Sequence, residues 1–246
     1  RDLDPGIALS ATTLRSKIEV CLASQLSVAG KAQRRVSLDD DRASEVFRIP
    51  LRKNRPVRFV KRIVTATSRQ GKDPQRAAAR ALRRYQRQGV AALQRSHVAA
   101  WADVWADADV GIRGDDQSQK QLRFSLFHLS GLALPEDDHV SLGAKGLHGN
   151  GYSGQVFWDT EVYLVPFFIF TDPEAARALL GFRCHGLADA RRNAEALGAR
   201  GGKFPWNAST QTSREHPHPG WQEHLNADIA WAVDLYVTAT GDTRFY

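Results

Sequence analysis

The sequence has 246 residues, of which 42% are hydrophobic and 25% are charged, as is typical of a globular protein with one large or two small domains. The apolar stretch at residues 162–170 is shorter than the roughly 18 to 20 residues that a membrane span needs. We therefore expect a soluble protein with no membrane partner.

The net charge of +7 is unevenly distributed along the chain. Residues 1–95 carry 22 lysines and arginines against 8 aspartates and glutamates, whereas residues 96–246 carry 12 against 19. Nucleic-acid-binding proteins often have such a basic half, and pairs such as Arg34–Arg35 and Arg83–Arg84 would be the contacts. However, no aromatic residues are interleaved with these basic residues, which alternate with apolar ones. The pattern favours a solvated surface and no nucleic-acid partner.

The two cysteines, Cys21 and Cys184, lie far apart and form neither a disulfide framework nor a metal-ligand spacing. This usage fits a reducing compartment, so we expect a cytoplasmic protein. The chain starts at Arg1, contains no methionine and lacks the pattern of a secretory signal. These features predict a truncated form of a longer protein.

From Thr12 to Thr67 the sequence has the alternating, β-branched texture of half-exposed strands. Clear examples are 46–51 and 57–64, and turn residues occur at Gly30 and at 39–41. We expect an antiparallel β region. Because about four strands make a poor isolated domain, residues 1–72 are predicted to be the C-terminal strands of an N-terminal β-sandwich.

Helical patterns begin at Asp73–Pro74, where an acidic cap precedes a proline, and a second helix follows Gly89. Trp101 and Trp105 fall on its apolar positions, so packing is their expected role. A third, mostly buried helix is predicted at 119–129, with His128 as a hydrogen-bonded core residue. Further helices are expected at 156–171, 173–184, 187–198 and 223–240, with Pro166 kinking or ending the first of them.

The segment 149–154 matches the dinucleotide-binding pattern G-x-G-x-x-G. A dinucleotide loop follows an apolar strand and leaves the next helix N-terminus free for phosphate. Here the preceding strand is weak, and Asp159 and Glu161 would repel phosphate from the helix start. The sequence therefore does not favour a dinucleotide site.

Trp158 and Asp159 combine an aromatic surface with a carboxylate, an arrangement with which proteins bind sugars. A carboxylate accepts hydroxyl hydrogen bonds worth roughly 1.5 to 3 kcal/mol each. The residues alone leave an alternative open, in which Asp159 caps a helix and Trp158 belongs to the core. On a helix, Asp159 and Glu161 would differ by about 200° and could not line one pocket together.

Trp206, with Asn207 beside it, offers a second aromatic contact for a sugar. His216, His218 and His224 invite a metal interpretation, but they include no i, i+4 pair and no paired cysteines. We expect no metal site.

With these residues assembled, the sequence resembles glycoside hydrolase family 65, which contains maltose, trehalose and kojibiose phosphorylases and acid trehalases. The resemblance rests on four blocks in the same order: Gly114–Asp115 with 119–129; 143–147 through Phe157-Trp158-Asp159-Thr160-Glu161; Phe204-Pro205-Trp206; and Glu223–His224 with 227–230 and 240–242. The block at 157–161 is highly specific.

The resemblance implies a mainly α fold with an N-terminal β region: a β-sandwich, a helical linker at 73–112 and the first part of an (α/α)6 barrel at 113–246. It implies that Trp158 and Asp159 bind the glucosyl unit of the donor. Trp206, Glu223 and His224 match blocks near the acceptor side, and are the other expected substrate-binding residues. A homodimer is implied for the complete enzyme.

The implied reaction is inverting phosphorolysis of an α-linked glucose disaccharide to glucose 1-phosphate and a free sugar. A glutamic acid protonates the leaving oxygen while inorganic phosphate, the co-substrate, attacks the opposite face, and no cofactor is needed. In the family, the general acid and the phosphate loop lie beyond the position of Tyr246. No catalytic residue is therefore expected within this chain, which should be inactive alone.

Two positions depart from the family pattern. Gln155 stands where the family usually has His, and Asn207 stands where it usually has Glu. Two alternatives stay open: a trehalase-type hydrolase, and a non-catalytic carbohydrate-binding or degenerate module, which is the alternative that these two changes favour.

Overall fold

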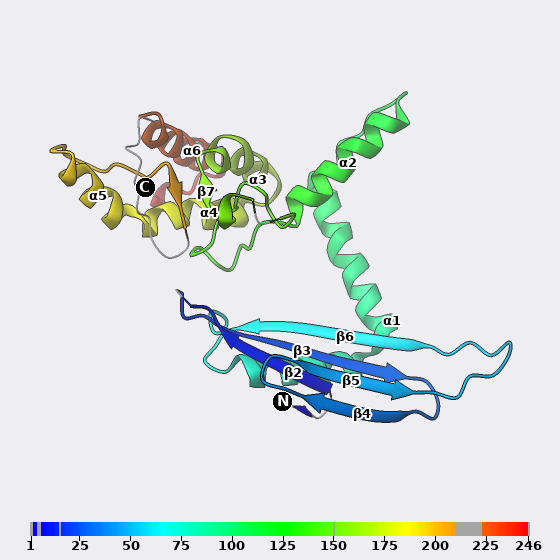
Figure 1. Ribbon diagram of the computed structural model, residues 1–246. Helices are drawn as coiled ribbons and strands as arrows, with labels where there is room; N and C mark the ends of the chain where they lie inside the picture. The colour runs from blue at the N-terminus through cyan, green and yellow to red at the C-terminus, as the bar shows by residue number, and fades with distance from the viewer. Residues whose placement is uncertain (1, 4–5, 15, 150, 210–222, 246) are drawn as a thin grey trace. The chain divides into compact units, whose positions relative to one another are not determined.

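The structure is a computed structural model that describes the chain except for residues 1, 4–5, 15, 150, 210–222 and 246. It has two compact units, residues 1–100 and residues 101–246. The first unit is built mainly from β-strands and the second mainly from helices (Figure 1). The predicted order, an N-terminal β region followed by helices, is confirmed.

The first unit contains a four-stranded antiparallel sheet with strand order β1-β2-β3-β6 (Figure 1). Its strands are β1 (Asp2–Leu3), β2 (Gly6–Thr12), β3 (Glu19–Val28) and β6 (Phe59–Thr67). A separate antiparallel hairpin contains β4 (Gln33–Leu38) and β5 (Ala43–Arg48). The antiparallel region predicted between residues 12 and 67 is confirmed, but the sequence pattern did not indicate β2.

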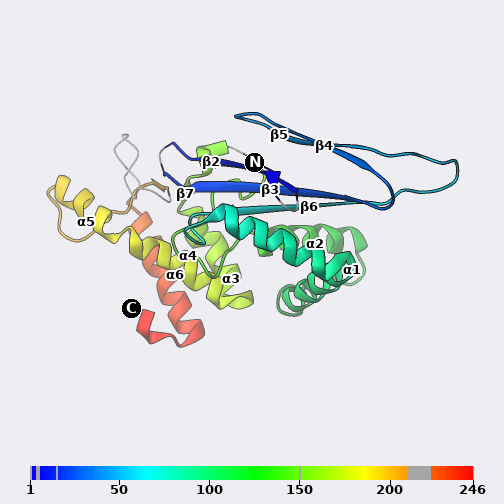
Figure 2. The same ribbon diagram turned by 90° about the horizontal axis from the view of Figure 1, so that it is seen from below.

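Alternation along the strands separates the two faces of this sheet. Cys21 and Ala23 of β3 are fully buried, and together with Ala66 they pack against Ala78 and Leu82 of α1 (Pro74–Ala108). Figure 2 shows the first part of α1 lying along the strands. Small side chains on the strands let the helix approach closely, so this face forms the core of the unit.

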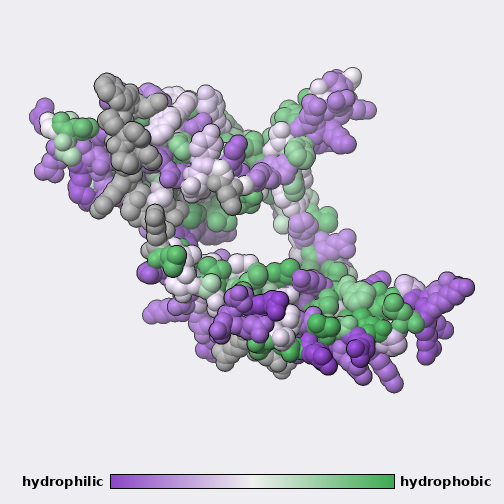
Figure 3. Space-filling model, in the orientation of Figure 1, coloured by the Kyte–Doolittle hydropathy of each residue, from purple (hydrophilic) through white to green (hydrophobic). Residues whose placement is uncertain are grey.

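The opposite face of the sheet carries exposed apolar side chains. Leu22, Phe59 and Ile63 are 48%, 52% and 58% exposed, and apolar surface is visible on this unit in Figure 3. A β-sandwich sheet presents such a face to a second sheet. The β-sandwich, with its proposed limits at residues 1–72, stays a prediction.

Helix α1 is interrupted at Gly89, whose φ of 74° and ψ of 163° are not helical. The first part begins with Asp73, whose Oδ1 accepts a hydrogen bond from the backbone N–H of Arg76 at 2.8 Å. Both the acidic start and the break at Gly89 agree with the sequence pattern. In the second part, Trp101 stacks on Phe127 with ring centroids 4.6 Å apart, which confirms a packing role.

The core of the second unit lies between α3 (Val165–Thr171), α4 (Pro173–His185) and α6 (Leu225–Thr240), which lie side by side in Figure 1. Phe168, Leu180 and Tyr236, one from each helix, are at most 4% exposed. The unit also contains α2 (Asp116–Ser130), α5 (Leu187–Ala196), and the short segments η1 (Gly151–Gly154) and η3 (Thr243–Phe245). The (α/α)6 barrel, and the linker and barrel limits at 73–112 and 113–246, stay predictions.

Two helix predictions need correction. Residues 156–171 are not one helix but a strand, β7 (Val156–Phe157), a π-helical turn, η2 (Thr160–Leu164), and α3. Helix α2 is not mostly buried, because Leu126 is buried whereas Phe124 and Phe127 are 66% and 44% exposed. Residues two apart on a helix point about 200° away from each other, so Phe124 and Leu126 cannot share one buried face.

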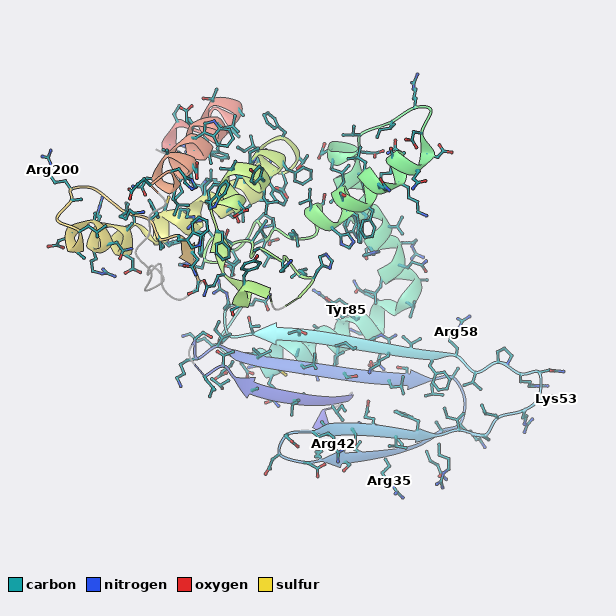
Figure 4. All side chains as sticks on the ribbon, turned by 45° about the horizontal axis from the view of Figure 1, so that its top comes forward. Arg35, Arg42, Lys53, Arg58, Tyr85 and Arg200 are labelled. Atoms are coloured by element: carbon teal, nitrogen blue, oxygen red, sulfur yellow. The ribbon has the colours of Figure 1, made fainter. Side chains whose placement is uncertain are left out.

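The basic residues of the first unit lie on several separate segments. Figure 4 shows Arg35 on β4, Arg42 in the turn before β5, and Lys53 and Arg58 in the loop before β6. Arg34 forms an ion pair with Glu45 at 2.7 Å instead of facing solvent alone. That the chain has no nucleic-acid partner stays a prediction. Every helix in the described part of the chain is too short or too polar to cross a membrane.

Candidate functional site

A two-stranded pairing brings two aromatic segments of the sequence together. β7 pairs with β8 (Asn207–Ala208) in antiparallel register, with Phe157 opposite Asn207. Trp158 directly follows β7 and Trp206 directly precedes β8. The rings of Phe157 and Trp206 meet edge to face, with centroids 5.9 Å apart. The pairing therefore joins the segments that contain the two predicted tryptophan contacts.

The half-buried ring of Trp158 also contacts His224, in the turn before α6. Their rings are nearly perpendicular, at 87°, with centroids 5.0 Å apart. His224 Nδ1 lies 2.5 Å from Asp228 Oδ2, a contact that orients the imidazole. Glu223 precedes His224 and is exposed. Three segments that are distant in the sequence thus meet around Trp158, and together they carry all five predicted substrate-binding residues.

The carboxylate of Asp159 is exposed and does not cap a helix. The residue stands at the N-cap position of η2, but its side chain accepts no capping hydrogen bond. Its φ of −52° and ψ of −33° are helical, whereas a capping residue usually has an extended backbone. The helix-cap alternative is therefore wrong, and the carboxylate is accessible to a ligand.

Glu161 points the opposite way and is fully buried. Arg183 of α4 donates two hydrogen bonds to it, Nε to Oε1 and Nη2 to Oε2, both at 2.8 Å. The two side chains are 0% and 3% exposed. Asp159 and Glu161 therefore face different environments, as predicted from their spacing on a helix.

The ion pair also fixes the strand before it. Arg183 Nη2 lies 3.4 Å from the carbonyl oxygen of Phe157, and the hydroxyl of Thr160 donates to the carbonyl of Leu142 at 3.0 Å. Trp158 and Asp159 lie between these anchored residues. Sequence reasoning missed Arg183. The signal that could have indicated it is Glu161, because a glutamate at the start of an apolar segment needs a positively charged partner when it is buried.

Two buried polar atoms beside Phe157 have no hydrogen-bond partner within the described residues. They are Nη1 of Arg183 and Oδ1 of Asn207. Buried polar groups are normally paired, so water or a bound hydroxyl is the expected partner. Both a donor and an acceptor are thus available close to the aromatic segments.

The glycine-rich loop leads into β7 and not into a helix. Tyr152 and Ser153 adopt left-handed conformations with φ of 58° and 53°. The ring of Tyr152 packs edge to face against the ring of Phe157, with the two ring centroids 5.4 Å apart. A dinucleotide loop would present a helix N-terminus to phosphate. The loop therefore supports the aromatic segment, and the dinucleotide interpretation fails here as the sequence suggested.

Of the three histidines weighed as metal ligands, His224 alone belongs to the part of the chain that the structure describes. His216 and His218 lie outside the described residues, and His224 contacts Asp228 and Trp158. A different group, Asp138 with His139 and His185, has ligand atoms within 4.8 Å of one another. Sequence reasoning missed this group because the two histidines are far apart in the chain.

Comparison with known proteins gives the same family along nearly the whole chain. The model of the glycosyl hydrolase family 65 N-terminal domain matches residues 1–104, and that of the family's central catalytic domain matches residues 123–246. A kojibiose phosphorylase of Thermoanaerobacter brockii is 36% identical over 82% of this chain and 28% of its own. A trehalose 6-phosphate phosphorylase of Lactococcus lactis is 34% identical over 95% of this chain and 32% of its own.

A solved structure of a candidate kojibiose phosphorylase from the human microbiome has the same fold. Its TM-score is 0.80 at 24% identity, and the match covers 99% of this chain and 33% of that chain. The chain thus spans about a third or less of the length of these relatives. The two family models match the chain in the expected order, the N-terminal domain over residues 1–104 and the central catalytic domain over residues 123–246. The chain therefore belongs to glycosyl hydrolase family 65.

Proposed function

We propose that the chain carries the donor-glucose contacts of an inverting α-glucoside phosphorylase, which converts a disaccharide and phosphate to glucose 1-phosphate and a free sugar. Trp158 would cover the apolar face of the glucosyl ring, and Asp159 would accept hydrogen bonds from its hydroxyls. The observation that carries the proposal is the exposed carboxylate of Asp159, which makes no helix-capping hydrogen bond and lies next in sequence to a half-buried tryptophan.

Trp206, Glu223 and His224 are proposed to contact the acceptor sugar. Trp206 contacts Phe157, the residue before Trp158; His224 contacts the ring of Trp158, and Glu223 precedes His224. Asn207 places an amide where the family usually has a carboxylate, which leaves Glu223 as the proposed acidic contact on the acceptor side. Proton donation to the leaving oxygen is assigned to a glutamic acid outside these residues, and the nucleophile is inorganic phosphate without a further cofactor.

The test measures phosphorolysis by the product of the full coding region. Kojibiose, trehalose and maltose are supplied in phosphate buffer, and glucose 1-phosphate is quantified. Loss of one charge-assisted hydrogen bond, about 1.5 to 3 kcal/mol, predicts that Asp159→Asn lowers kcat/KM by roughly 10- to 100-fold. Asp103→Asn, which changes an exposed aspartate of α1, is the control and should leave kcat/KM unchanged.

The alternatives give different results. Free glucose released independently of phosphate indicates a trehalase-type hydrolase. Sugar binding that Asp159→Asn abolishes, without any product, indicates a non-catalytic carbohydrate-binding module. Full activity in Asp159→Asn refutes the assigned sugar contact.

A further inference from the structure

Three side chains form a compact group of metal-ligand type away from the aromatic segments. His185 Nε2 lies 3.1 Å from Asp138 Oδ2, and His139 Nε2 lies 3.9 Å from Asp138 Oδ1. The two imidazole rings are stacked, with centroids 3.9 Å apart and planes inclined by 15°. One carboxylate therefore faces two imidazole nitrogens.

The backbone holds the group from two sides. The N–H of His139 donates to Asp137 Oδ1 at 3.0 Å, which closes a local turn in the loop after α2. In α4, Gly181 lies one turn before His185, and a Cβ at Gly181 would lie only 3.0 Å from the Cβ of Asp138. The missing side chain lets the loop rest on the helix, on the face that presents His185.

A simple ion pair explains only part of this geometry. The contact between Asp138 and His185 accounts for one imidazole, and His139 places a second imidazole nitrogen 3.9 Å from the same carboxylate. A metal ion instead uses both histidines in their neutral form together with the carboxylate. Two imidazoles and a carboxylate with ligand atoms within 4.8 Å of one another are the ligand types that such an ion binds.

The distances also suit a transition metal. Zn²⁺ binds imidazole nitrogen and carboxylate oxygen at about 2.0 to 2.2 Å, which puts tetrahedral ligand atoms roughly 3.4 Å apart. In the structure, one carboxylate oxygen of Asp138 lies 3.1 Å from His185 Nε2 and the other lies 3.9 Å from His139 Nε2, both close to that spacing. Because the rings are stacked, both imidazoles have to rotate before their nitrogens point at one ion, and all three residues are exposed at the surface.

The surroundings of the group are acidic. Asp138 lines a surface cavity of about 400 Å³ together with Glu136, Glu174 and Arg177. The one basic residue of this lining, Arg177, lies 3.4 Å from Asp242 and is thus already paired. The remaining carboxylates favour a cation near Asp138.

We propose that Asp138, His139 and His185 bind a first-row divalent transition-metal ion, with Zn²⁺ as the probe. The protein supplies three ligands, and water completes the coordination. Mg²⁺ is not expected to bind, because it prefers oxygen ligands.

The test titrates ZnCl₂ into the 246-residue chain by isothermal titration calorimetry. Wild-type protein should bind one equivalent at this site, and His185→Ala and Asp138→Asn should each weaken that binding by about tenfold or more. His97→Ala, which removes an exposed histidine of α1, and Cys184→Ala, which removes the thiol next to His185, should leave the affinity unchanged. Far-UV circular dichroism checks that each variant is folded.

Two results would overturn the proposal. One is a wild-type chain that takes up no Zn²⁺ at about 100 µM, where a micromolar site would be saturated. The other is Zn²⁺ binding of unchanged affinity in His139→Ala and His185→Ala but lost in His224→Ala, which would assign the ion to the His224–Asp228 pair.

Discussion

The buried pair of Glu161 and Arg183 predicts a large and specific loss of stability when either partner is removed. In Glu161→Gln, Arg183 stays buried without its counterion, and in Arg183→Met the carboxylate is left alone. Both side chains are nearly inaccessible to bulk solvent, so bulk water cannot compensate for the lost ion pair. The double replacement Glu161→Leu with Arg183→Met removes both charges and leaves apolar side chains of similar size.

The magnitude follows from the geometry. Two parallel hydrogen bonds of 2.8 Å place the charge centres about 4 Å apart, where the attraction is about 4 kcal/mol at an effective dielectric constant of ~20. Removing one partner of a buried pair costs about 3 to 5 kcal/mol, whereas replacing both by apolar residues is often nearly neutral. Each single variant should therefore be about 3 to 5 kcal/mol less stable than wild type, with the double variant close to wild type.

Tryptophan fluorescence during urea unfolding measures this loss in the right part of the molecule. All six tryptophans lie between residues 101 and 246, so the signal reports the helical unit alone. Arg123→Met is the matched control: Arg123 also makes a two-pronged ion pair, with Asp109, but at the surface, and its loss should matter much less. The reasoning would be refuted if Glu161→Gln had the same free energy of unfolding as Arg123→Met. It would also be refuted if the double variant lost as much stability as the two single variants added together.

Gly6→Ala should destabilise the sheet, because the new Cβ would lie 2.2 Å from a carbonyl oxygen of β3; Gly30→Ala has a similar positive φ but open space around it. Backbone strain should cost about 1 to 3 kcal/mol in both variants, and the clash adds to this cost only in Gly6→Ala. Amide hydrogen exchange of β3 should therefore be faster in Gly6→Ala than in Gly30→Ala, and equal exchange rates in the two variants would contradict the role of the clash. Asp115 caps α2, and the hydrogen bond from the Ser118 hydroxyl lowers the pKa of the Asp115 carboxyl below its ordinary value of 3.8. The cap therefore stabilises the helix fully above pH 3.8, and this stabilisation is lost as the pH falls through the lowered pKa of the folded state. Asp115→Ala should reduce amide protection in the first turn of α2 at pH 7 while Asp116→Ala should not, and equal protection in the two would argue against the cap.

Local signals in the sequence predicted the helix ends well. Asp73 and Asp172 both cap helices that begin with proline, and Gly241 ends α6 in a left-handed conformation. Such signals act over three or four residues and do not depend on the rest of the fold. The alternating strands β3 and β6 were predictable for the same reason, whereas β2 is rich in small residues and gives little pattern.

Long-range pairings were not predictable from the sequence. Residues 156–157 form a strand because β8 arrives from 50 residues further along the chain, and no local pattern indicates that partner. Likewise the partner of Glu161 lies 22 residues away, on a different helix. The candidate site could be named residue by residue, but the neighbours that hold it depend on tertiary contacts.

The π-helical turn η2 has a consequence for how relatives of this protein can differ. Its backbone bond from Val165 N–H to the Thr160 carbonyl spans five residues, one more than in an α-helix. Deleting one residue from this turn would restore α-helical spacing and rotate Trp158 and Asp159 by about 100° relative to α3. A change of a single codon could thus redirect Trp158 and Asp159, the proposed sugar contacts, while every residue of the helical core is conserved.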